Sequence, residues 1–309
     1  MITCYKNIDN GLSLLAEPIS GSWINATNPS MEEIAQLESL GIPQDYINYP
    51  LDLDERARTE RENGDLLIVL RIPYYQGKSA DIPYSTIPLG IILTERLLVT
   101  VCKMENSVVN ELSSGRIRGL STAKRHRFVL RILLNTANQY LGYLREITKS
   151  VDTLEDQLQR STRNKEVLEL LKYQKSLTLF TTALKSNELM MERLQRSRIF
   201  ETYPEDEELL EDVLTENRQA IEMTNISSNI LSSMMDAFAS IISNNLNGVM
   251  KFLASVTIML SLPTMIASFF GMNVHLPFEA NPMAFLLIII LSAGIALCAA
   301  YIFWKRDWF

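Results

Sequence analysis

The sequence predicts an α+β membrane protein, in which a charged α/β domain is followed by long helices and two C-terminal membrane spans. Three observations support this prediction: charge is unevenly distributed, two uncharged apolar runs lie near the C-terminus, and an apolar repeat with helical spacing occupies the middle of the chain. With 47% hydrophobic and 21% charged residues, the 309-residue chain is not a disordered chain, a collagen, a disulfide scaffold or a basic nucleic-acid binder. We therefore expect no nucleic-acid partner.

Charge separates the chain into two parts. Residues 250–309 contain five charged residues in sixty, three basic and two acidic. The preceding 249 residues contain 26 basic and 34 acidic residues, a net charge of −8 against −7 for the whole chain. The average composition therefore combines a charged, water-soluble part with a nearly uncharged one.

Two runs in the C-terminal part are long enough to cross a bilayer. Phe252–Phe270 has 19 residues and Met283–Trp304 has 22, and neither contains a charged residue. A helix rises about 1.5 Å per residue, so about 20 apolar residues span a hydrocarbon core of roughly 30 Å. We expect transmembrane helices over 250–270 and 283–304, joined by the short loop 271–282. A buried soluble helix is the alternative for one run, but two neighbouring runs disfavour it.

Basic residues predict the orientation of these spans. Lys251 precedes the first span, and Lys305 and Arg306 follow the second, whereas the loop 271–282 has no Lys or Arg. Cytoplasmic flanks carry an excess of basic residues. We therefore expect a multi-pass protein of the plasma membrane, with the N-terminus and the basic tail 305–309 in the cytoplasm.

The first 120 residues predict a cytoplasmic α/β domain that starts with a turn and a helix. We expect a turn over Asn25–Met31. Ser30 and Glu33 have the spacing of a capping box, which predicts a helix that ends near Gly41.

Strand-like runs follow in the same domain. Asn63-Gly64 lies between two of them and indicates a β-hairpin. Asp65–Tyr75 and Ile87–Lys103 are rich in Ile, Leu and Val, and Thr94–Arg96 predicts a turn within the second run.

Residues 121–204 predict long antiparallel helices of the coiled-coil type. Apolar residues step by three and four over 130–158 and again over 173–194. The second repeat has one polar member, Asn187. We expect the helical hairpin between the two repeats at 161–164.

A third helix is predicted to begin at Pro204. Four acidic residues at 205–208 suit its N-terminus, where the helix dipole favours negative charge. No other proline occurs before Pro263, and Gly248 is the one interior glycine. We expect a stalk helix over 205–249 that continues into the first span, about 65 residues or roughly 100 Å in length.

One face of the first span is small or polar. Lipid disfavours hydroxyl and amide groups, so such a face turns to another helix or to water. Close helix packing through small residues is the alternative explanation. One helix cannot enclose water, whereas a symmetric ring of copies can, so we expect a closed homo-oligomer. The residues of this polar stripe are Asn247, Met250, Ala254, Thr257, Ser261, Thr264 and Ser268.

The stripe ends at Phe270-Gly271-Met272-Asn273. Glycine permits a tight turn and close backbone approach. A ring of Asn273 side chains would offer several neutral carbonyl oxygens at one depth. Because Mg²⁺ prefers six oxygen ligands and releases water reluctantly, such a ring suits the hydrated ion.

With these features the sequence resembles the CorA family of magnesium transporters, two-span metal ion transporters with a Gly-Met-Asn motif. The resemblance rests on Gly271-Met272-Asn273 after the first C-terminal span, on the preceding segment 262–268, on the end 305–308 and on the order of the domains. It implies a funnel-shaped homopentamer that takes up Mg²⁺, and related ions such as Co²⁺ and Ni²⁺, down the electrochemical gradient. The partners implied are the other copies of the chain, the lipid bilayer and divalent cations.

The resemblance also implies roles for individual residues. Gly271, Met272 and Asn273 would form the selectivity filter. Met250 and Leu253, the latter one position off the stripe, would form a hydrophobic gate. The remaining pore-lining positions are Asn247, as an inner polar ring, Thr257, Ser261, Thr264 and Ser268.

In this family, cytoplasmic Mg²⁺ binds between subunits, bridges acidic residues and holds the pore closed. The matching stretches are Gln44-Asp45 and Glu211-Asp212. The resemblance therefore implies that Asp45 and Asp212 form a regulatory metal site, whereas an exposed aspartate by itself is usually a solvated surface charge. Gln44 stands where the family frequently has an acid.

Two other departures concern the pore mouth. Phe270 stands where the family usually has Tyr, and Glu279 is the one acid of the outer loop. Weaker attraction of cations to this loop would follow.

Two alternative functions stay open at this point. One is a ZntB-like transporter of zinc or another divalent metal, although Met272 favours the magnesium branch. The other is a non-conducting, membrane-tethered coiled-coil scaffold or sensor, which would need neither the polar stripe nor the motif. The chain has no Walker A sequence, Gly-rich nucleotide loop or nucleophile elbow. We expect no enzymatic activity and no organic cofactor, with Mg²⁺ as both cargo and regulator.

Overall fold

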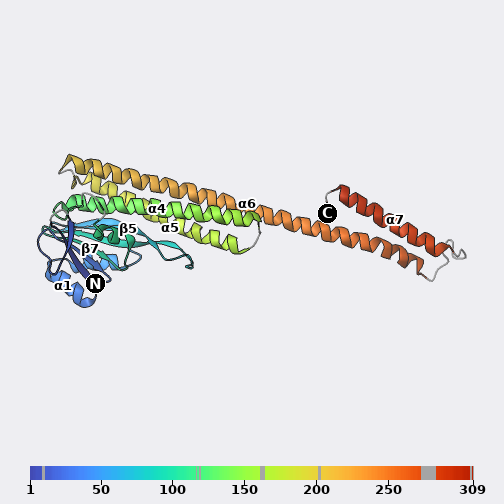
Figure 1. The fold of residues 1–309 in the computed structure, drawn as a ribbon, viewed down its shortest axis with the longest axis horizontal. Helices are drawn as coiled ribbons and strands as arrows, with labels where there is room; N and C mark the ends of the chain where they lie inside the picture. Colours follow the sequence, from blue (N-terminus) through green and yellow to red (C-terminus); the bar gives the residue numbers. More distant parts are fainter. Residues whose placement is uncertain are drawn as a thin grey trace. The chain divides into compact units, whose positions relative to one another are not determined.

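The structure is a computed structural model that describes residues 1–8, 11–115, 117, 120–160, 164–200, 203–272, 283–306 and 308. The chain forms two compact units, Met1–Met234 and Met235–Phe309 (Figure 1).

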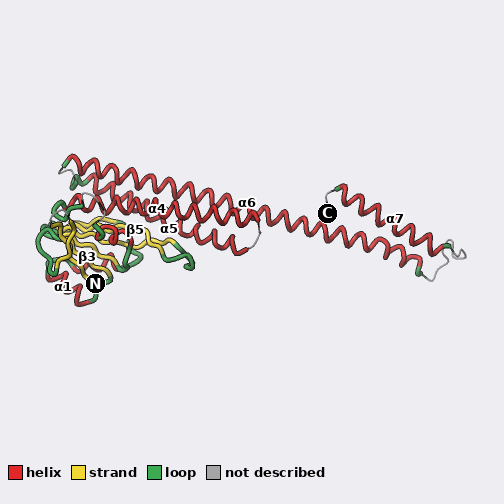
Figure 2. The backbone as a smooth tube through the Cα atoms, viewed as in Figure 1, coloured by secondary structure: helices red, strands yellow, loops and turns green. Residues whose placement is uncertain are grey.

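A seven-stranded mixed sheet forms the centre of the first unit (Figure 2). The strand order is β2-β1-β3-β7-β6-β5-β4, in which β3 and β7 run parallel and the five other neighbouring pairs run antiparallel. The strands are β1 (Ile2–Ile8), β2 (Gly11–Leu15), β3 (Trp23–Thr27), β4 (Arg58–Glu62), β5 (Asp65–Tyr75), β6 (Tyr84–Leu93) and β7 (Leu98–Cys102).

The predicted hairpin and turn of the sheet are confirmed. Asn63 and Gly64 join β4 to β5 with φ angles of 51° and 95°, the left-handed pair that a two-residue hairpin of type I′ requires. The turn after β6 is closed by the Thr94 amide, which donates to the Leu97 carbonyl at 3.0 Å. Both turns depend on local chemistry, so they could be predicted from sequence.

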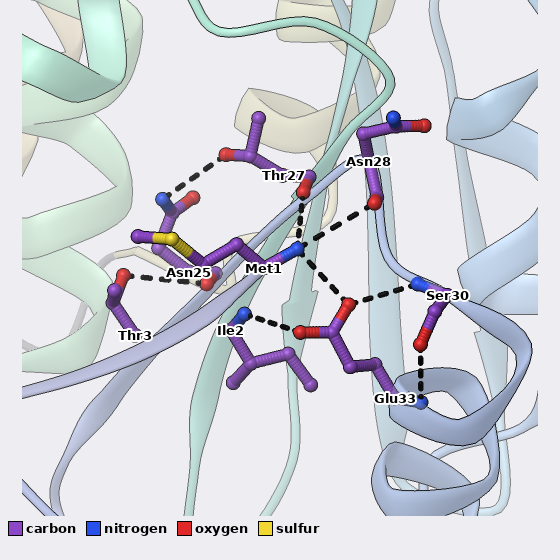
Figure 3. A network of polar contacts seen from close by, with 8 residues as sticks. All are labelled: Met1, Ile2, Thr3, Asn25, Thr27, Asn28, Ser30 and Glu33. Atoms are coloured by element: carbon purple, nitrogen blue, oxygen red, sulfur yellow. Dashed lines mark hydrogen bonds and ion pairs between the residues drawn. The ribbon is translucent and has the colours of Figure 1, made fainter.

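The helix α1 (Met31–Ser39) begins at the predicted capping box. The Ser30 hydroxyl accepts from the Glu33 amide at 3.2 Å, and the Glu33 carboxylate accepts from the Ser30 amide at 2.8 Å. The same carboxylate accepts from the Ile2 amide at 3.0 Å and pairs with the Met1 amine at 2.9 Å (Figure 3). Glu33 thereby joins the start of α1 to the first strand.

The turn predicted over Asn25–Met31 is wrong in its first part, because residues 23–27 form the strand β3. β3 lies between β1 and β7, and the Asn25 side chain accepts a hydrogen bond from the Thr100 hydroxyl at 3.0 Å. Pairing on both edges thus outweighs the local turn preference of asparagine.

Helices cover both faces of the sheet (Figure 1). On one face, α1, α2 (Gln44–Asn48) and the 3-10 turn η1 (Tyr49–Leu51) bury Leu37, Tyr46 and Ile47. The other face is covered by α3 (Ser107–Ser113), α4 (Arg125–Arg160), α5 (Asn164–Arg196) and the beginning of α6 (Pro204–Phe270).

The two apolar repeats lie in α4 and α5 and face inward. All seven residues of the α5 repeat are buried: Tyr173, Leu177, Phe180, Leu184, Asn187, Met191 and Leu194. In the α4 repeat Leu154 is partly buried, and the others are buried: Leu130, Leu133, Ala137, Tyr140, Leu144, Ile147, Val151 and Leu158. α5 and α6 run antiparallel, because the side chain of Gln174 bonds Ser228 whereas that of Asn217 bonds the Leu184 carbonyl. The hairpin predicted at 161–164 falls mostly outside the described residues.

The predicted third helix is confirmed as α6, which begins at Pro204 and continues through Pro263 to Phe270. Its acidic first turn is held to α4: Arg127 pairs with Asp206 at 2.6 Å and with Glu205 at 2.7 Å. These ion pairs join the start of α6 to the start of α4.

The second unit contains the rest of α6 and α7 (Ala284–Lys305). Both helices are long and apolar enough to cross a membrane, with mean hydropathies of 1.8 and 2.6 over their most apolar windows. Only 6% of the window in α6 and none of the window in α7 is buried. Their apolar surface therefore has to be covered by lipid or by other chains.

Candidate functional site

The polar stripe of α6 is exposed along its whole length. Asn247, Thr257, Ser261, Thr264 and Ser268 are all exposed. The two predicted gate residues are equally open, since Met250 is 57% and Leu253 58% exposed. From Asn247 to Ser268 the helix rises about 32 Å, which matches the roughly 30 Å core of a bilayer.

The opposite face of α6 is the covered one. Ser255 is fully buried, and Val256, Met259, Leu262, Pro263 and Ile266 are partly buried. At about 100° per residue these positions lie roughly half a turn from the stripe. Leu253 falls at the edge of the stripe, beside Thr264.

α7 belongs to the same unit as the end of α6, and one side of it is less exposed than the rest. Its less exposed residues fall on one side of the helix, and five of the seven are alanine or serine, which permits close helix approach. We infer that α7 packs on the back of α6 and leaves the stripe open to other surroundings. These residues are Ala284, Ile288, Ser292, Ala296, Ala299, Ala300 and Phe303.

The hydroxyl groups of the stripe direct their hydrogens to the helix backbone. Thr257 donates to the Leu253 carbonyl at 2.8 Å, Ser261 to Ile258 at 2.9 Å and Thr264 to Leu260 at 2.9 Å. This pattern satisfies each hydroxyl donor inside an apolar environment. The oxygen lone pairs remain available as acceptors, and the water shell of a cation presents hydrogens outward. The stripe is therefore suited to a hydrated cation.

Apolar residues border the stripe. A shallow groove of about 630 Å³ along α6 is lined by four stripe hydroxyl residues together with Leu260, Met265 and Phe269. The sequence prediction did not include these three residues, although they lie at neighbouring angles on the same helix. An apolar border is what a helix needs to contact equivalent helices on either side of a polar lumen.

The described part of the Gly-Met-Asn motif closes α6. The Gly271 amide donates to the Ala267 carbonyl at 3.0 Å and to the Ser268 carbonyl at 3.2 Å, and Met272 is 53% exposed. Among the described residues, a Cβ at Gly271 would approach the Ala267 and Ser268 carbonyl oxygens of its own helix, at 3.4 Å and 3.6 Å. Asn273 lies outside the described residues.

The predicted regulatory residues lie on opposite sides of the sheet. Asp45 is exposed on α2, which packs on one face, whereas Asp212 is exposed on α6, whose neighbouring residues Leu210 and Val213 pack on the other. The two carboxylates of one chain therefore cannot share an ion. They can meet only between two copies.

Metal-ligating side chains are not clustered in the part of the chain that the structure describes. Among the residues that the structure describes, no group of three or more His, Cys, Asp or Glu side chains could hold a metal ion. The candidate pore and the candidate regulatory site thus share one property, that each would be completed by other copies of the chain.

Fold and site together define a class of protein. It is a membrane protein with two C-terminal helices long enough to span, an exposed polar stripe on the first, and an α/β unit packed against long helices. Membrane transport proteins combine such features.

Comparison with known proteins identifies the family. Residues 20–306 match the family described as CorA-like Mg2+ transporter protein, and the chain belongs to this family. A curated relative, the cobalt/magnesium transport protein CorA of Methanocaldococcus jannaschii, is 30% identical over 298 residues, which cover 93% of this chain and 90% of the relative.

Solved structures agree with this assignment. The complete structure of the CorA magnesium transporter from M. jannaschii matches with a TM-score of 0.86 and 26% identity, covering 100% of this chain and 99% of that one. The ZntB cytoplasmic domain from Vibrio parahaemolyticus matches with a TM-score of 0.60 and 11% identity over 78% of this chain and 98% of that one, which shows a shared fold alone.

Proposed function

We propose that the chain forms a homopentameric CorA-type channel that carries Mg²⁺, and with it Co²⁺, across the plasma membrane. Membership of the CorA-like Mg2+ transporter family supports this proposal, as does a 30% identical relative named as a cobalt/magnesium transport protein. Transport, and no catalytic reaction, is the activity that the family implies.

The observation that carries the proposal is the exposed polar stripe of α6. Asn247 and the hydroxyl residues from Thr257 to Ser268 follow one line along the part of α6 that is long and apolar enough to span a membrane. Exposure of these groups to lipid would be costly, and five copies around an axis would bring them together around water. Because the less exposed side of α6 lies opposite the polar stripe, the stripe is available to face the axis of such a ring.

In the proposed pore, the ion keeps its water shell along most of the path. Lone pairs of the stripe hydroxyls accept hydrogen bonds from that shell, and the Asn273 carbonyls act as an outer filter together with Gly271 and Met272. Met250 and Leu253 form the closure near the cytoplasmic end, because apolar side chains in a narrow ring expel water and raise the barrier for an ion.

The direction of flow follows from the gradient. Lys251, Lys305 and Arg306 flank the spans and favour cytoplasmic N- and C-termini. An inside-negative potential contributes about 2.3 kcal/mol per charge per 100 mV, so a divalent ion gains about twice that on entry. Uptake needs no nucleotide hydrolysis.

We propose that Asp45 of one subunit and Asp212 of the next bind the regulatory Mg²⁺. Their positions on opposite faces of the sheet support this arrangement, because a ring uses head-to-tail contacts in which one face meets the opposite face of its neighbour. Bound ions would bridge the subunits at high cytoplasmic Mg²⁺ and hold the pore closed.

Liposome flux tests the proposed function. Purified protein should take up Mg²⁺ along an inside-negative potential, and Asn273→Ala should reduce the flux at least tenfold. Unchanged uptake in this variant would reject the filter. A non-conducting scaffold would give no flux in either protein.

Competition among Mg²⁺, Co²⁺, Ni²⁺ and Zn²⁺ in the same flux assay determines which ion the protein transports preferentially. A ZntB-like transporter would carry zinc in preference to Mg²⁺, and that result would replace magnesium as the proposed substrate.

A further inference from the structure

A pocket in the first unit, far along the sequence from the polar stripe, has no part in the proposed pore. Its volume is about 660 Å³, and it is formed by the loop before β4, by β5 and β6, and by one side of α5. The basic residues Arg56, Arg71 and Lys185 line it together with hydroxyl and apolar side chains.

Arg71 forms the floor of this pocket. Its guanidinium donates to the Leu53 carbonyl at 2.6 Å, to the Glu55 carbonyl at 3.0 Å, and to both the carbonyl and the hydroxyl of Thr86 at 2.7 and 2.8 Å. All four acceptors are neutral. Burial lowers the pKa of Arg71, but an arginine keeps its charge in proteins. A fixed positive charge therefore remains inside the pocket.

The acids of the pocket do not cancel this charge. Glu55 pairs at 3.0 Å with Arg58, which also pairs with Glu60, and Asp54 makes no ion pair within 4 Å among the described residues. Arg56 and Lys185 likewise have no ion-pair partner in this part of the chain and stand exposed at the rim. The lining therefore has three basic groups against two carboxylates, one of which, Glu55, also pairs with Arg58.

Hydrogen-bond donors accompany the positive charge. The Thr86 hydroxyl accepts from Arg71, so its own hydrogen is free to donate into the pocket. Ser186, on α5, also lines the pocket. A phosphate group accepts hydrogen bonds only and is matched by such a set of cationic and hydroxyl donors.

The α5 side of the pocket carries apolar side chains beside the polar ones of Thr181, Thr182, Lys185 and Ser186. Leu179, Ala183 and Leu189 project from α5 along the pocket, and Leu189 is 61% exposed. The pocket is also several times larger than one phosphate ion needs, within the range typical of sites for small organic ligands. Both features suit a ligand with a phosphate at one end and an apolar part at the other.

We propose that this pocket binds a small organic phosphate monoester, with its phosphate held by Arg56, Lys185 and the Thr86 hydroxyl over Arg71, and its apolar part against Leu189. The site lies on the same chain as the proposed transporter but does not depend on ion flux. Failure of one proposal leaves the other standing.

Calorimetry on the full-length protein in lipid nanodiscs, at a fixed concentration of free Mg²⁺, tests this site. The probes are phenyl phosphate, a minimal molecule of the proposed class, and inorganic phosphate. We expect phenyl phosphate to bind one site per chain and at least tenfold more tightly than inorganic phosphate. No binding of phenyl phosphate at millimolar concentration, or equal affinity for the two probes, would overturn the proposal.

Rim variants locate the binding. Lys185→Glu and Arg56→Glu should each weaken phenyl phosphate at least tenfold, because both residues are exposed and neither holds the fold. Leu189→Ala should weaken phenyl phosphate but leave inorganic phosphate unchanged. Lys149→Glu, an exposed charge reversal on α4 away from the pocket, is the matched control. An equal loss in Lys149→Glu would show general charge attraction and reject the site.

Discussion

The side chain of Asn187 forms both hydrogen bonds of a strand partner with the backbone of Arg71. Its Oδ1 accepts from the Arg71 amide at 2.9 Å, and its Nδ2 donates to the Arg71 carbonyl at 2.7 Å. Asn187 lies on α5 and Arg71 on β5, so this pair joins the long helices to the sheet. The Tyr140 hydroxyl of α4 donates to the same carbonyl at 3.0 Å.

Strand pairing explains why Arg71 needs this partner. β4 pairs with β5 only from Asp65 to Val69, where Arg58 is the last residue of the ladder. In an antiparallel pair, alternate residues turn their N–H and C=O groups to the same neighbour. Arg71 lies two residues after Val69, so its backbone N–H and C=O groups point toward the side on which β4 has already ended. Asn187, only 1% exposed, occupies this vacancy.

We predict that Asn187→Leu destabilises the first unit by about 2 kcal/mol, because it leaves a buried amide without an acceptor and a carbonyl with one donor fewer. Denaturant unfolding followed by the fluorescence of buried Trp23 measures this loss. Thr178→Leu is the control, since Thr178 is exposed on the same helix and its hydroxyl bonds only its own backbone. Equal losses in both variants would contradict the role given to Asn187.

Gly90 allows β6 to pass directly beneath Pro50. A Cβ on Gly90 would overlap the ring of Pro50 at its Cγ atom, and a proline ring cannot rotate away. We therefore predict that Gly90→Ala destabilises the first unit by about 1–3 kcal/mol or more, as overpacking does. Gly142→Ala is the matched comparison: a Cβ there meets nothing within 4 Å, and the α4 helix should gain about 1 kcal/mol. The opposite order of stabilities would refute this explanation.

The capping box of α1 gives a stability prediction. Ser30→Ala removes the acceptor for the Glu33 amide and should cost about 1 kcal/mol. Ser39→Ala, whose hydroxyl is exposed and bonds only Gln36 of its own helix, should cost clearly less. Denaturant midpoints of the two variants provide the comparison.

Glu33 makes part of this stability dependent on pH. The hydrogen bond from the Ser30 amide, followed by the contact with the Met1 amine, lowers the pKa of Glu33 from its usual 4.5. A lowered pKa in the folded state stabilises the protein above pH 4.5, and this stabilisation is lost as the pH falls through the folded pKa. The stability difference between wild type and Glu33→Gln should therefore be constant near neutrality and shrink in acid. A difference that grows in acid would exclude this assignment.

The proposed regulatory site predicts an effect of charge reversal. Asp212→Lys, and separately Asp45→Lys, should remove most of the protection that millimolar Mg²⁺ gives against limited proteolysis, because each takes one carboxylate from a site between subunits. Glu222→Lys reverses an exposed acid elsewhere on α6 and should keep the protection. If both aspartate variants are protected as well as wild type, the regulatory ion binds elsewhere.

Features encoded by local sequence could be predicted, and those that need distant partners could not. The capping box at Ser30, the hairpin at Asn63-Gly64 and the unbroken helix from Pro204 follow from neighbouring residues. Local sequence does not predict β1 and β2, and the turn predicted over Asn25–Met31 includes part of β3, because pairing within the sheet decides these strands. The sequence analysis also does not include the helix α3, although its start carries a local signal: the Asn106 side chain accepts from the Val109 amide at 3.0 Å.

The same division holds for the candidate sites. Helical periodicity alone places Thr257, Ser261 and Thr264 on one line. Which side of the sheet carries Asp45 or Asp212 depends on how the helices pack, and the pocket over Arg71 combines segments more than one hundred residues apart. Asn273 falls outside the described residues, so its role rests on the family.

The stripe itself makes the sharpest prediction about transport, because the two sides of α6 differ in what covers them. Ser261→Leu places a bulky apolar group on the exposed polar line, where it should narrow and dry the proposed pore and reduce Mg²⁺ flux at least tenfold. Met259→Leu introduces the same residue on the covered face, where it nearly conserves volume and apolar character, and should leave flux within about twofold. If α6 used its stripe only for helix packing, Ser261→Leu would instead lower the oligomeric state or the yield of folded protein. Flux per pentamer, measured after size-exclusion chromatography, separates a blocked pore from a lost assembly. Normal flux in Ser261→Leu together with blocked flux in Met259→Leu would place the ion on the opposite face of the helix.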